Sequence, residues 1–342
     1  MSNRILIVNV NWLGDVLFST PFIRAVREAH PDSHITCLVH PRCAEILQDN
    51  PRINEIIIYD EEGVHKSLLG KLKLIFLLRN KKFDTAFLLH RSFTKALIVK
   101  LTGVRELIGY PTKNRSMLLT GVVEEPDEPI HKVEYFLNVA RHVGIKPVSA
   151  SYEFFITNQD RNYAKELMRM NNVQEKDLTV VLCPGGNWDP KRWPKESFAA
   201  LADLLIERLG AKIVISGGRK EYSLAEGIGK LMKHESVNIC SRTTLKQLAA
   251  IFETASLVIA NDTGTMHLAV AMKARVIALF GPTSSAITGP YGEGRYSVIS
   301  SDVPCDIPCY DITCTDNKCM RSIKVEDVFL AAERMLKGDE DR

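Results

Sequence analysis

Asn261-Asp262-Thr263-Gly264-Thr265-Met266-His267 is the stretch of sequence that decides the fold. It follows an apolar run, residues 255–260, that is typical of a buried parallel strand. An Ala-rich helix is expected after it at residues 267–273, and a second strand at 275–280. Strand, polar turn, helix and strand form a βαβ unit, which places a ligand site at the carboxyl end of a parallel sheet. The sequence therefore predicts an α/β protein with its site at that edge.

The turn itself has the chemistry of a diphosphate cradle. Asp262 or Thr263 can cap the helix, and the backbone N–H groups of Gly264 and Thr265 can then point at an anion. Gly264 has no side chain to hold that anion away. Taken alone, the turn is better explained as a simple N-cap before a helix. The matching motifs elsewhere in the chain favour an anion site.

A second glycine-rich loop follows a strand predicted at residues 179–183. Gly185 and Gly186 leave backbone donors free for a ligand oxygen, and Lys191 and Arg192 supply positive charge for a phosphate. Two glycines alone are weak support. Combined with two cations after a strand, they indicate an anionic ligand between this loop and the Asp262 turn.

Two more side chains stand at strand ends in the same half of the chain. Glu221 follows a strand predicted at 212–216 and can hold a pair of ribose hydroxyls. It is equally well explained as a surface acid at the start of a helix. Thr283 follows the strand at 275–280 and can bond to a phosphate or a base.

The N-terminal half begins with a strand predicted at residues 5–10 and a helix from Val16 to about Ala29. Gly14 and Asp15 lie between them, at the edge where the active sites of open α/β sheets lie. Gly14 suggests a close backbone approach, but a G-x-G-x-x-G dinucleotide fingerprint is absent. Asp15 is either a functional carboxylate or an acid that only complements the helix dipole, worth up to about 1 kcal/mol.

Further cations follow the later strands of this half. Lys95 lies at a strand end and helix start, and Lys113 and Arg115 lie in a turn-rich loop. Each of them can be an ordinary solvated surface residue. Clustered beside Asp15 at one sheet edge, they would form a pocket for an acidic acceptor.

The hydrophobic pattern restarts near Thr157, which predicts an N-terminal domain at residues 1–157 and a C-terminal domain at 158–342. Both halves consist of repeated βα units, so we expect two Rossmann-like domains facing each other across a cleft. The C-terminal domain includes a cysteine-rich loop at 305–319 and a closing helix at 324–337. The loop lacks the paired C-x2-C knuckles of zinc sites, which favours free thiols or a late disulfide over a metal. Its cysteines are Cys305, Cys309, Cys314 and Cys319.

Composition excludes several classes of protein. The 342 residues carry 44 Lys and Arg against 41 Asp and Glu, a net charge of +3, which gives no support for nucleic-acid binding. A local basic patch facing an anionic membrane or substrate is still compatible with this charge. No apolar run reaches the ~18–20 residues that span a bilayer. The start lacks the features of a signal peptide, and the eight cysteines fit a reducing compartment. We therefore expect a cytoplasmic protein.

Four motifs in this order across two domains resemble glycosyltransferase family 9, which contains the ADP-heptose:lipopolysaccharide heptosyltransferases. The resemblance covers nearly the whole chain. Residues 92–96, Gly109-Tyr110 and Cys319-Met320 are most similar to the heptosyltransferase II branch. The four motifs are Asn11 to Leu17, the Gly185-Gly186 loop ending in Lys191-Arg192-Trp193-Pro194, Asp262 to His267, and Phe280-Gly281-Pro282-Thr283.

The resemblance implies a GT-B fold that binds the acceptor in the N-terminal domain and ADP-heptose in the C-terminal domain. It implies an inverting transfer from ADP-L-glycero-D-manno-heptose to the heptosyl-Kdo₂-lipid A core of lipopolysaccharide. We predict that no metal or other cofactor is required, because no Asp-x-Asp motif stands where a metal-dependent transferase would place one. Peripheral contact with the inner membrane is compatible with this role. Asp15 matches the family's proposed general base, which would act only after domain closure. Lys191 matches the lysine near the donor phosphates. The other implied donor contacts are Gly14, Gly185, Gly186, Glu221, Asp262, Thr263, Gly264, Thr265, His267 and Thr283, and the implied acceptor contacts are Lys95, Lys113 and Arg115.

The chain departs from the family at Thr265-Met266, where Leu-Ser often precedes the histidine. Three alternatives stay open from the sequence. The first is heptosyltransferase I or III, or another sugar transferase of the same family. The second is a nucleotide-sugar epimerase or hydrolase with the same architecture. The third is a binding protein that carries a metal in its cysteine-rich loop.

Overall fold

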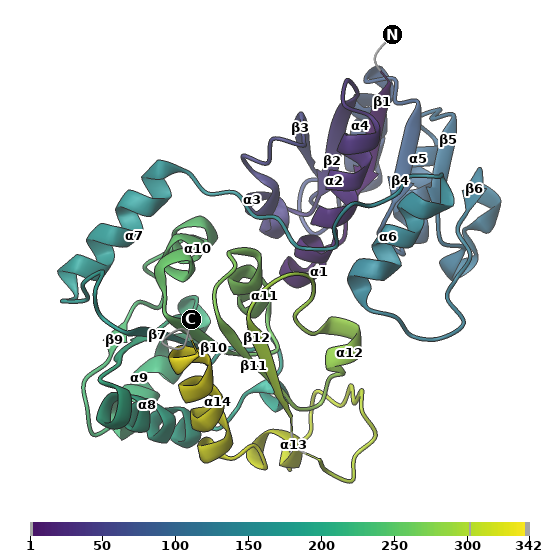
Figure 1. Ribbon diagram of the computed structural model, residues 1–342. Coiled ribbons are helices and arrows are strands. Elements are labelled where there is room, and N and C mark those ends of the chain that lie inside the picture. Colours follow the sequence, from purple (N-terminus) through teal and green to yellow (C-terminus); the bar gives the residue numbers. More distant parts are fainter. Residues whose placement is uncertain (1–2, 301, 339–342) are drawn as a thin grey trace. The chain divides into compact units, whose positions relative to one another are not determined.

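The computed structural model describes residues 3–300 and 302–338, and the chain forms two compact units, residues 1–155 and 156–342. The sequence places this division near Thr157. In the described residues each unit contains one six-stranded sheet, and every strand pair is parallel (Figure 1). No helix within the described ranges is long and apolar enough to cross a membrane.

The N-terminal sheet has the order β3-β2-β1-β4-β5-β6, which is the doubly wound Rossmann order. Its elements are β1 (Arg4–Val8), α1 (Leu13–Phe18), α2 (Thr20–Ala29), β2 (His34–Val39), η1 (Pro41–Cys43), α3 (Ala44–Leu47), β3 (Glu55–Ile58), α4 (Leu68–Asn80), β4 (Thr85–Leu88), α5 (Phe93–Lys100), β5 (Glu106–Gly109), η2 (Thr112–Asn114), η3 (Ser116–Leu118), β6 (Gly121–Val122) and α6 (Lys132–His142).

The C-terminal sheet repeats the same order from its own first strand, β9-β8-β7-β10-β11-β12. The predicted α/β class with two Rossmann-like domains is therefore confirmed. Its elements are α7 (Asn158–Met170), β7 (Thr179–Cys183), η4 (Asp189–Lys191), α8 (Lys195–Leu209), β8 (Lys212–Ile215), η5 (Arg219–Glu221), α9 (Tyr222–Leu231), β9 (Val237–Asn238), α10 (Leu245–Thr254), β10 (Leu257–Asn261), α11 (Gly264–Ala271), β11 (Val276–Phe280), α12 (Ser285–Thr288), β12 (Tyr296–Ser300), α13 (Lys318–Arg321) and α14 (Val325–Lys337).

The central strands are buried on both faces, as parallel strands with helices on each side must be. All five residues of β7, β10 and β11 are buried. This is why these strands occur in the sequence as continuous apolar runs rather than as alternating patterns. Helices α8 and α14 contribute apolar side chains to the core of the C-terminal unit, and α4 and α5 contribute to that of the N-terminal unit.

One helix that the sequence predicts as continuous is divided into two in the structure. The sequence predicts a single helix from Val16 to about Ala29, but the chain forms α1 and α2 with Ser19 between them. Pro21 lies at the start of α2 and has no N–H to donate to the carbonyl of Leu17. The Thr20 hydroxyl donates to that carbonyl instead, at 2.8 Å. Because α1 ends early, Asp15 lies in the first turn of a helix of only six residues.

Candidate active site

The carboxyl ends of β7 and β10 form the topological switch point of the C-terminal sheet. The chain leaves β7 towards β8 on one side, whereas β10 lies on the other side. Loops that leave two neighbouring strands in opposite directions open a crevice between them, and ligands of open α/β sheets bind there. The two motifs predicted to bind the donor, the Gly185-Gly186 loop and the Asp262 turn, follow these two strands.

Asn261 holds the two loops together. Its side chain is fully buried at the end of β10, where Nδ2 donates to the carbonyls of Pro184 (2.8 Å) and Gly185 (3.1 Å). Its Oδ1 accepts from the Trp193 N–H at 3.2 Å. Both ends of the loop after β7 are thus fixed to β10 by one amide. Sequence reasoning assigns Asn261 no role, although a polar residue that ends a buried apolar run needs partners inside the fold.

Asn261→Leu is expected to lower the free energy of unfolding of the C-terminal unit by about 3 kcal/mol, because it leaves one buried N–H and two carbonyls without partners. Urea unfolding followed by tryptophan fluorescence measures this change. Asn162→Leu, on the exposed side of α7, is the matched control and should change little. A loss below about 0.5 kcal/mol for Asn261→Leu, the size of an ordinary surface change, would mean that other contacts hold the loop.

Asp262 is the centre of a three-residue cluster drawn from three loops. Its Oδ2 accepts from Lys191 Nζ at 2.6 Å and from the Thr283 hydroxyl at 2.6 Å. The side chains of Asp262 and Lys191 are 7% and 16% exposed. The Lys191 ammonium also lies 4.8 Å from the centre of the Trp188 ring. This arrangement holds one cation at the switch point with part of its surface open to a ligand.

The first turn of α11 adds hydrogen-bond donors beside this cation. The helix begins at Gly264, three residues earlier than predicted, and Thr263 caps it by accepting from the Met266 N–H at 3.4 Å. Among the described residues, the Gly264 and Thr265 amides donate to no protein acceptor. Amides of this kind, with the positive end of the helix dipole, favour an anion. The His267 side chain is buried, so the turn presents mainly its backbone.

Close packing restricts the loop after β7 at Gly185. A Cβ on Gly185 would lie 2.8 Å from Glu221 Cγ. Glu221 also accepts from the Gly218 N–H at 2.9 Å, which fixes its carboxylate beside the loop. Arg192, predicted to supply charge for a phosphate, instead donates to the Gly186 carbonyl at 2.8 Å. Of the two predicted cations, Lys191 points to the cluster and Arg192 holds the loop.

The cysteine-rich loop, residues 305–319, packs against these turns, and sequence reasoning does not foresee this. The Cys309 N–H donates to the Pro282 carbonyl at 2.7 Å, and the Asn317 side chain donates to the Arg192 carbonyl at 3.3 Å. The loop therefore supports the segments before Thr283 and after Lys191. Within the described residues none of its thiols forms a disulfide, and no group of three or more His, Cys, Asp or Glu is arranged to hold a metal. These thiols are Cys305, Cys309, Cys314 and Cys319.

A charged network occupies the switch point of the N-terminal sheet, between β1 and β4. Lys95 Nζ donates to Asn11 Oδ1 at 2.7 Å and lies 3.2 Å from Glu61 Oε1, which also accepts from Asn11 Nδ2 at 2.6 Å. Lys95 is only 3% exposed, and burial lowers its pKa despite the attraction of Glu61. Burial alone would raise the pKa of Glu61, but the charge of Lys95 holds it below its usual value. The network fixes the turn that leads to Asp15.

Asp15 lies in the first turn of α1, one residue after Gly14, and its side chain is half-buried. The negative charge of its carboxylate affects the pKa of the Cys43 thiol. Burial raises the pKa of Cys43 to about 11, and the Asp15 charge adds to the rise while Arg42 opposes it. The structure thus places Asp15 at the carboxyl end of β1, as predicted, within a polar environment.

Arg115 differs from a surface cation. It is fully buried, its Nε donates to the Tyr110 carbonyl at 2.8 Å, and its Nη1 donates to the His90 carbonyl. Burial lowers its pKa to about 10. Lys95 and Arg115 therefore hold the domain together, and their contact with an acceptor stays a prediction. The Lys113 side chain, the third predicted acceptor contact, lies outside the described residues.

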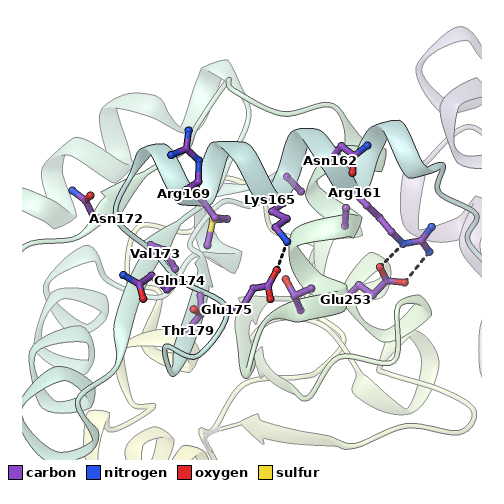
Figure 2. Close-up of a pocket in the computed structure, with 14 residues that line it drawn as sticks. Arg161, Asn162, Lys165, Arg169, Asn172, Val173, Gln174, Glu175, Thr179 and Glu253 are labelled. Atoms are coloured by element: carbon purple, nitrogen blue, oxygen red, sulfur yellow. Dashed lines mark hydrogen bonds and ion pairs between the residues drawn. The ribbon is translucent and has the colours of Figure 1, made fainter.

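A hollow of about 930 Å³ lies elsewhere in the C-terminal unit, between α7 and α10 (Figure 2). It includes Thr179, at the amino end of β7, whereas the Asp262 cluster lies at the carboxyl ends. Four of its charged side chains form two ion pairs: Arg161 contacts Glu253 at 2.7 Å, and Lys165 contacts Glu175 at 2.7 Å (Figure 2). None of the predicted site residues lines it, so we do not assign the active site to this hollow.

Comparison with known proteins identifies the family. The model of glycosyltransferase family 9 (heptosyltransferase) matches residues 71–320, which is most of the chain. The chain belongs to glycosyltransferase family 9. The predicted family is thereby confirmed, and the protein is a glycosyltransferase of the heptosyltransferase family.

Family 9 relatives include more than one type of heptosyltransferase. Lipooligosaccharide heptosyltransferase 2 of Haemophilus ducreyi is 27% identical over 307 residues, 84% of this chain and 86% of that protein. Lipopolysaccharide heptosyltransferase 3 of Escherichia coli is 26% identical over 339 residues, 95% of this chain and 96% of that protein.

Solved structures agree with the family 9 fold. The glycosyltransferase family 9 protein of Veillonella parvula superposes with a TM-score of 0.91 at 26% identity, covering 99% of this chain and 98% of that one. The E. coli ADP-heptose LPS heptosyltransferase II superposes with a TM-score of 0.81 at 23% identity, covering 98% and 99%.

Proposed function

We propose that the protein transfers heptose from ADP-L-glycero-D-manno-heptose to the heptosyl-Kdo₂-lipid A inner core of lipopolysaccharide, with inversion at the anomeric carbon. The supporting observation is the Lys191–Asp262–Thr283 cluster beside the open amides of α11, at the switch point of the C-terminal sheet. A cation and N–H groups fixed in advance stabilise the charge that develops on a departing diphosphate.

The proposed reaction is a single displacement. An acceptor hydroxyl oxygen attacks the anomeric carbon, the bond from that carbon to the diphosphate oxygen breaks, and ADP leaves with the electron pair. The hydroxyl proton passes to Asp15 as general base. Lys191 and the Gly264 and Thr265 amides take up the negative charge of ADP, and Glu221 contacts the ribose. We keep Gly14, Gly185, Gly186, Thr263, His267 and Thr283 as donor contacts in this proposal.

The names of the relatives support ADP-heptose as the donor and leave more than one lipopolysaccharide core acceptor to be tested. The E. coli structure with a similar fold is named an ADP-heptose LPS heptosyltransferase II, and the H. ducreyi relative is a heptosyltransferase 2. A heptosyltransferase 3 is similar at nearly the same identity. The type II acceptor is therefore the part of the proposal that an experiment has to decide. We further propose that the enzyme acts in the cytoplasm, in peripheral contact with the inner membrane.

The deciding experiment offers the protein ADP-heptose with three acceptors in parallel: Kdo₂-lipid A, its heptosyl form and its diheptosyl form. We expect ADP release to require an acceptor and to be fastest with the heptosyl form. Preference for the first or third acceptor would overturn the type II proposal and leave the family assignment intact. Release without any acceptor would indicate a hydrolase instead.

We expect transfer to continue at an unchanged rate after treatment with EDTA. Lys191 and the helix amides supply the positive charge for the diphosphate, so no metal has to do so. The rate of ADP release before and after chelation, with re-addition of Mg²⁺ as control, measures this. Loss of transfer in EDTA that Mg²⁺ restores would contradict metal independence. Loss that only zinc or iron restores would direct attention to the cysteine-rich loop.

A further inference from the structure

Helix α4 has apolar side chains on its outer side as well as on its inner side. Leu74 and Leu78 are buried in the core of the N-terminal unit. Leu68, Leu72 and Phe76 recur every four residues on the opposite side, and Leu68 and Phe76 are 75% and 62% exposed. The pattern of Leu, Ile, Lys and Arg over residues 68–80 predicts a helix with one mostly apolar face, and the exposed apolar side chains on its outer side show that this prediction is wrong. A surface helix normally turns polar residues outward, so the outer stripe has no explanation within the domain.

The neighbouring helix continues this apolar surface. Phe93 and Leu97 in α5 and Leu101, which caps this helix at its C-terminus, follow the same four-residue spacing, and all three are exposed. The two helices contact each other in the described structure, and Figure 1 shows them side by side. We call the surface made by Leu68, Leu72, Phe76, Phe93, Leu97 and Leu101 the α4–α5 face. Large apolar side chains exposed on two helices that contact each other indicate an interaction site.

Positive charge surrounds the stripe on α4. Residues 63–83 contain six Lys and Arg and no Asp or Glu, although the whole chain has a net charge of only +3. Lys81 pairs with Glu55 at 2.6 Å. The other five form no ion pair with any described residue. Successive residues are about 100° apart around a helix, so Lys71 and Lys73 lie on either side of the stripe. The five are Lys66, Lys71, Lys73, Arg79 and Lys82.

We propose that the α4–α5 face docks on the surface of an anionic phospholipid bilayer. Apolar side chains flanked by Lys and Arg, with no acids among them, fit the boundary between acyl chains and negatively charged headgroups. A second copy of the chain fits poorly. A two-fold symmetric contact brings the same patch of both copies together and would oppose cations to cations. This surface deepens the proposed function, because an acceptor anchored by lipid A lies in a membrane.

The test is flotation of the protein with vesicles of phosphatidylglycerol and phosphatidylethanolamine, compared with vesicles of phosphatidylcholine alone. We expect binding to the anionic vesicles only, weakened by added salt. L72S/F76S should reduce the partition coefficient by about tenfold or more, because two side chains no longer enter the bilayer. Each neutralised cation should reduce it about fivefold, so K71Q/K73Q/R79Q should lose about a hundredfold.

Matched variants in the C-terminal unit are the controls. L231S/L330S removes two exposed apolar side chains, and K176Q/K230Q/K233Q makes the same change in charge. Both should bind vesicles as the unchanged protein does. Because all substituted side chains are on the surface, melting temperatures should stay close to that of the unchanged protein, which checks that each variant folds.

Several results would overturn the proposal. They are failure of the unchanged protein to bind anionic vesicles, equal binding by L72S/F76S, and equal loss in the control variants. Light scattering that finds a dimer which L72S/F76S dissociates would assign the face to a protein partner instead. The vesicles contain no lipopolysaccharide acceptor, so their binding does not depend on the proposed reaction. Heptose transfer is measured separately, with the acceptor dispersed in detergent. Failure of docking is therefore distinguishable from failure of the proposed reaction.

Discussion

Asp15→Asn is expected to lower kcat for heptose transfer by about 10³-fold while the KM for ADP-heptose stays nearly unchanged. A positioned general base contributes ~10²–10⁴-fold, and asparagine keeps the shape of the side chain but cannot accept the proton. Apart from Gly14, the proposed donor contacts lie in the other unit, so donor binding should survive. Acceptor-dependent ADP release under saturating donor measures kcat.

The competing explanation for Asp15 is electrostatic support of α1. An acid in the first turn of a helix stabilises it by at most about 1 kcal/mol, and its loss should affect unfolding rather than kcat. Asp32→Asn, an exposed acid of the same unit, is the control for a change of charge alone. A variant of Asp15 that loses stability but keeps kcat within a few-fold would remove it from the catalytic machinery.

Much of the fold follows from the sequence because the strands are buried on both faces. β7 has the bounds that its apolar pattern predicts, Thr179–Cys183, and β8 and α14 differ from their predicted bounds by one residue each. Errors occur where a single residue changes the backbone. Pro21 divides one predicted helix into two, and the Thr263 cap starts α11 earlier than its apolar residues suggest. These effects are local, and the residues that cause them, a proline and a capping threonine, are recognisable in the sequence itself.

The candidate site is predictable to the level of a sheet edge but not to that of individual contacts. Strand order brings Lys191 and Asp262 to one switch point although 71 residues separate them. The sequence alone does not tell that Lys191 meets Asp262 whereas Arg192 turns to the Gly186 carbonyl. Two cations adjacent in sequence point in different directions, and only the path of η4 decides which one reaches the cluster.

Burial of charge is the second limit of the sequence. Lys95 fits a solvated helix start, yet it is buried against Asn11 and Glu61, 84 and 34 residues away. Such a cation is tolerated only when partners compensate for the loss of water, and those partners come from other strand ends. Neither the secondary-structure propensity of Lys95 nor a sequence motif around it identifies these partners. The role of Lys95 in the N-terminal unit is accordingly harder to predict from the sequence than its position at a strand end.

Lys191→Ala is expected to lower kcat/KM for ADP-heptose by about 10³-fold, the upper range for losing one preorganised donor to a developing anion. The variant removes the cation. It also leaves the mostly buried Asp262 carboxylate facing the diphosphate, with Thr283 as its one remaining side-chain partner among the described residues. Both effects act against the transition state. Lys191→Arg keeps the charge and should retain more activity than Lys191→Ala. Initial rates of ADP release over a range of donor concentrations measure the change.

The double variant K191A/D262N separates the two effects. If Lys191 only neutralises Asp262, removing both charges should restore activity to within about tenfold of the unchanged protein, as expected when a buried pair is replaced rather than broken. If Lys191 stabilises the departing diphosphate, the double variant should recover stability but remain about 10²-fold slow in kcat. We expect the second result. We expect this because ADP gains negative charge as it departs, and Lys191 is the cation that the cluster holds at the switch point.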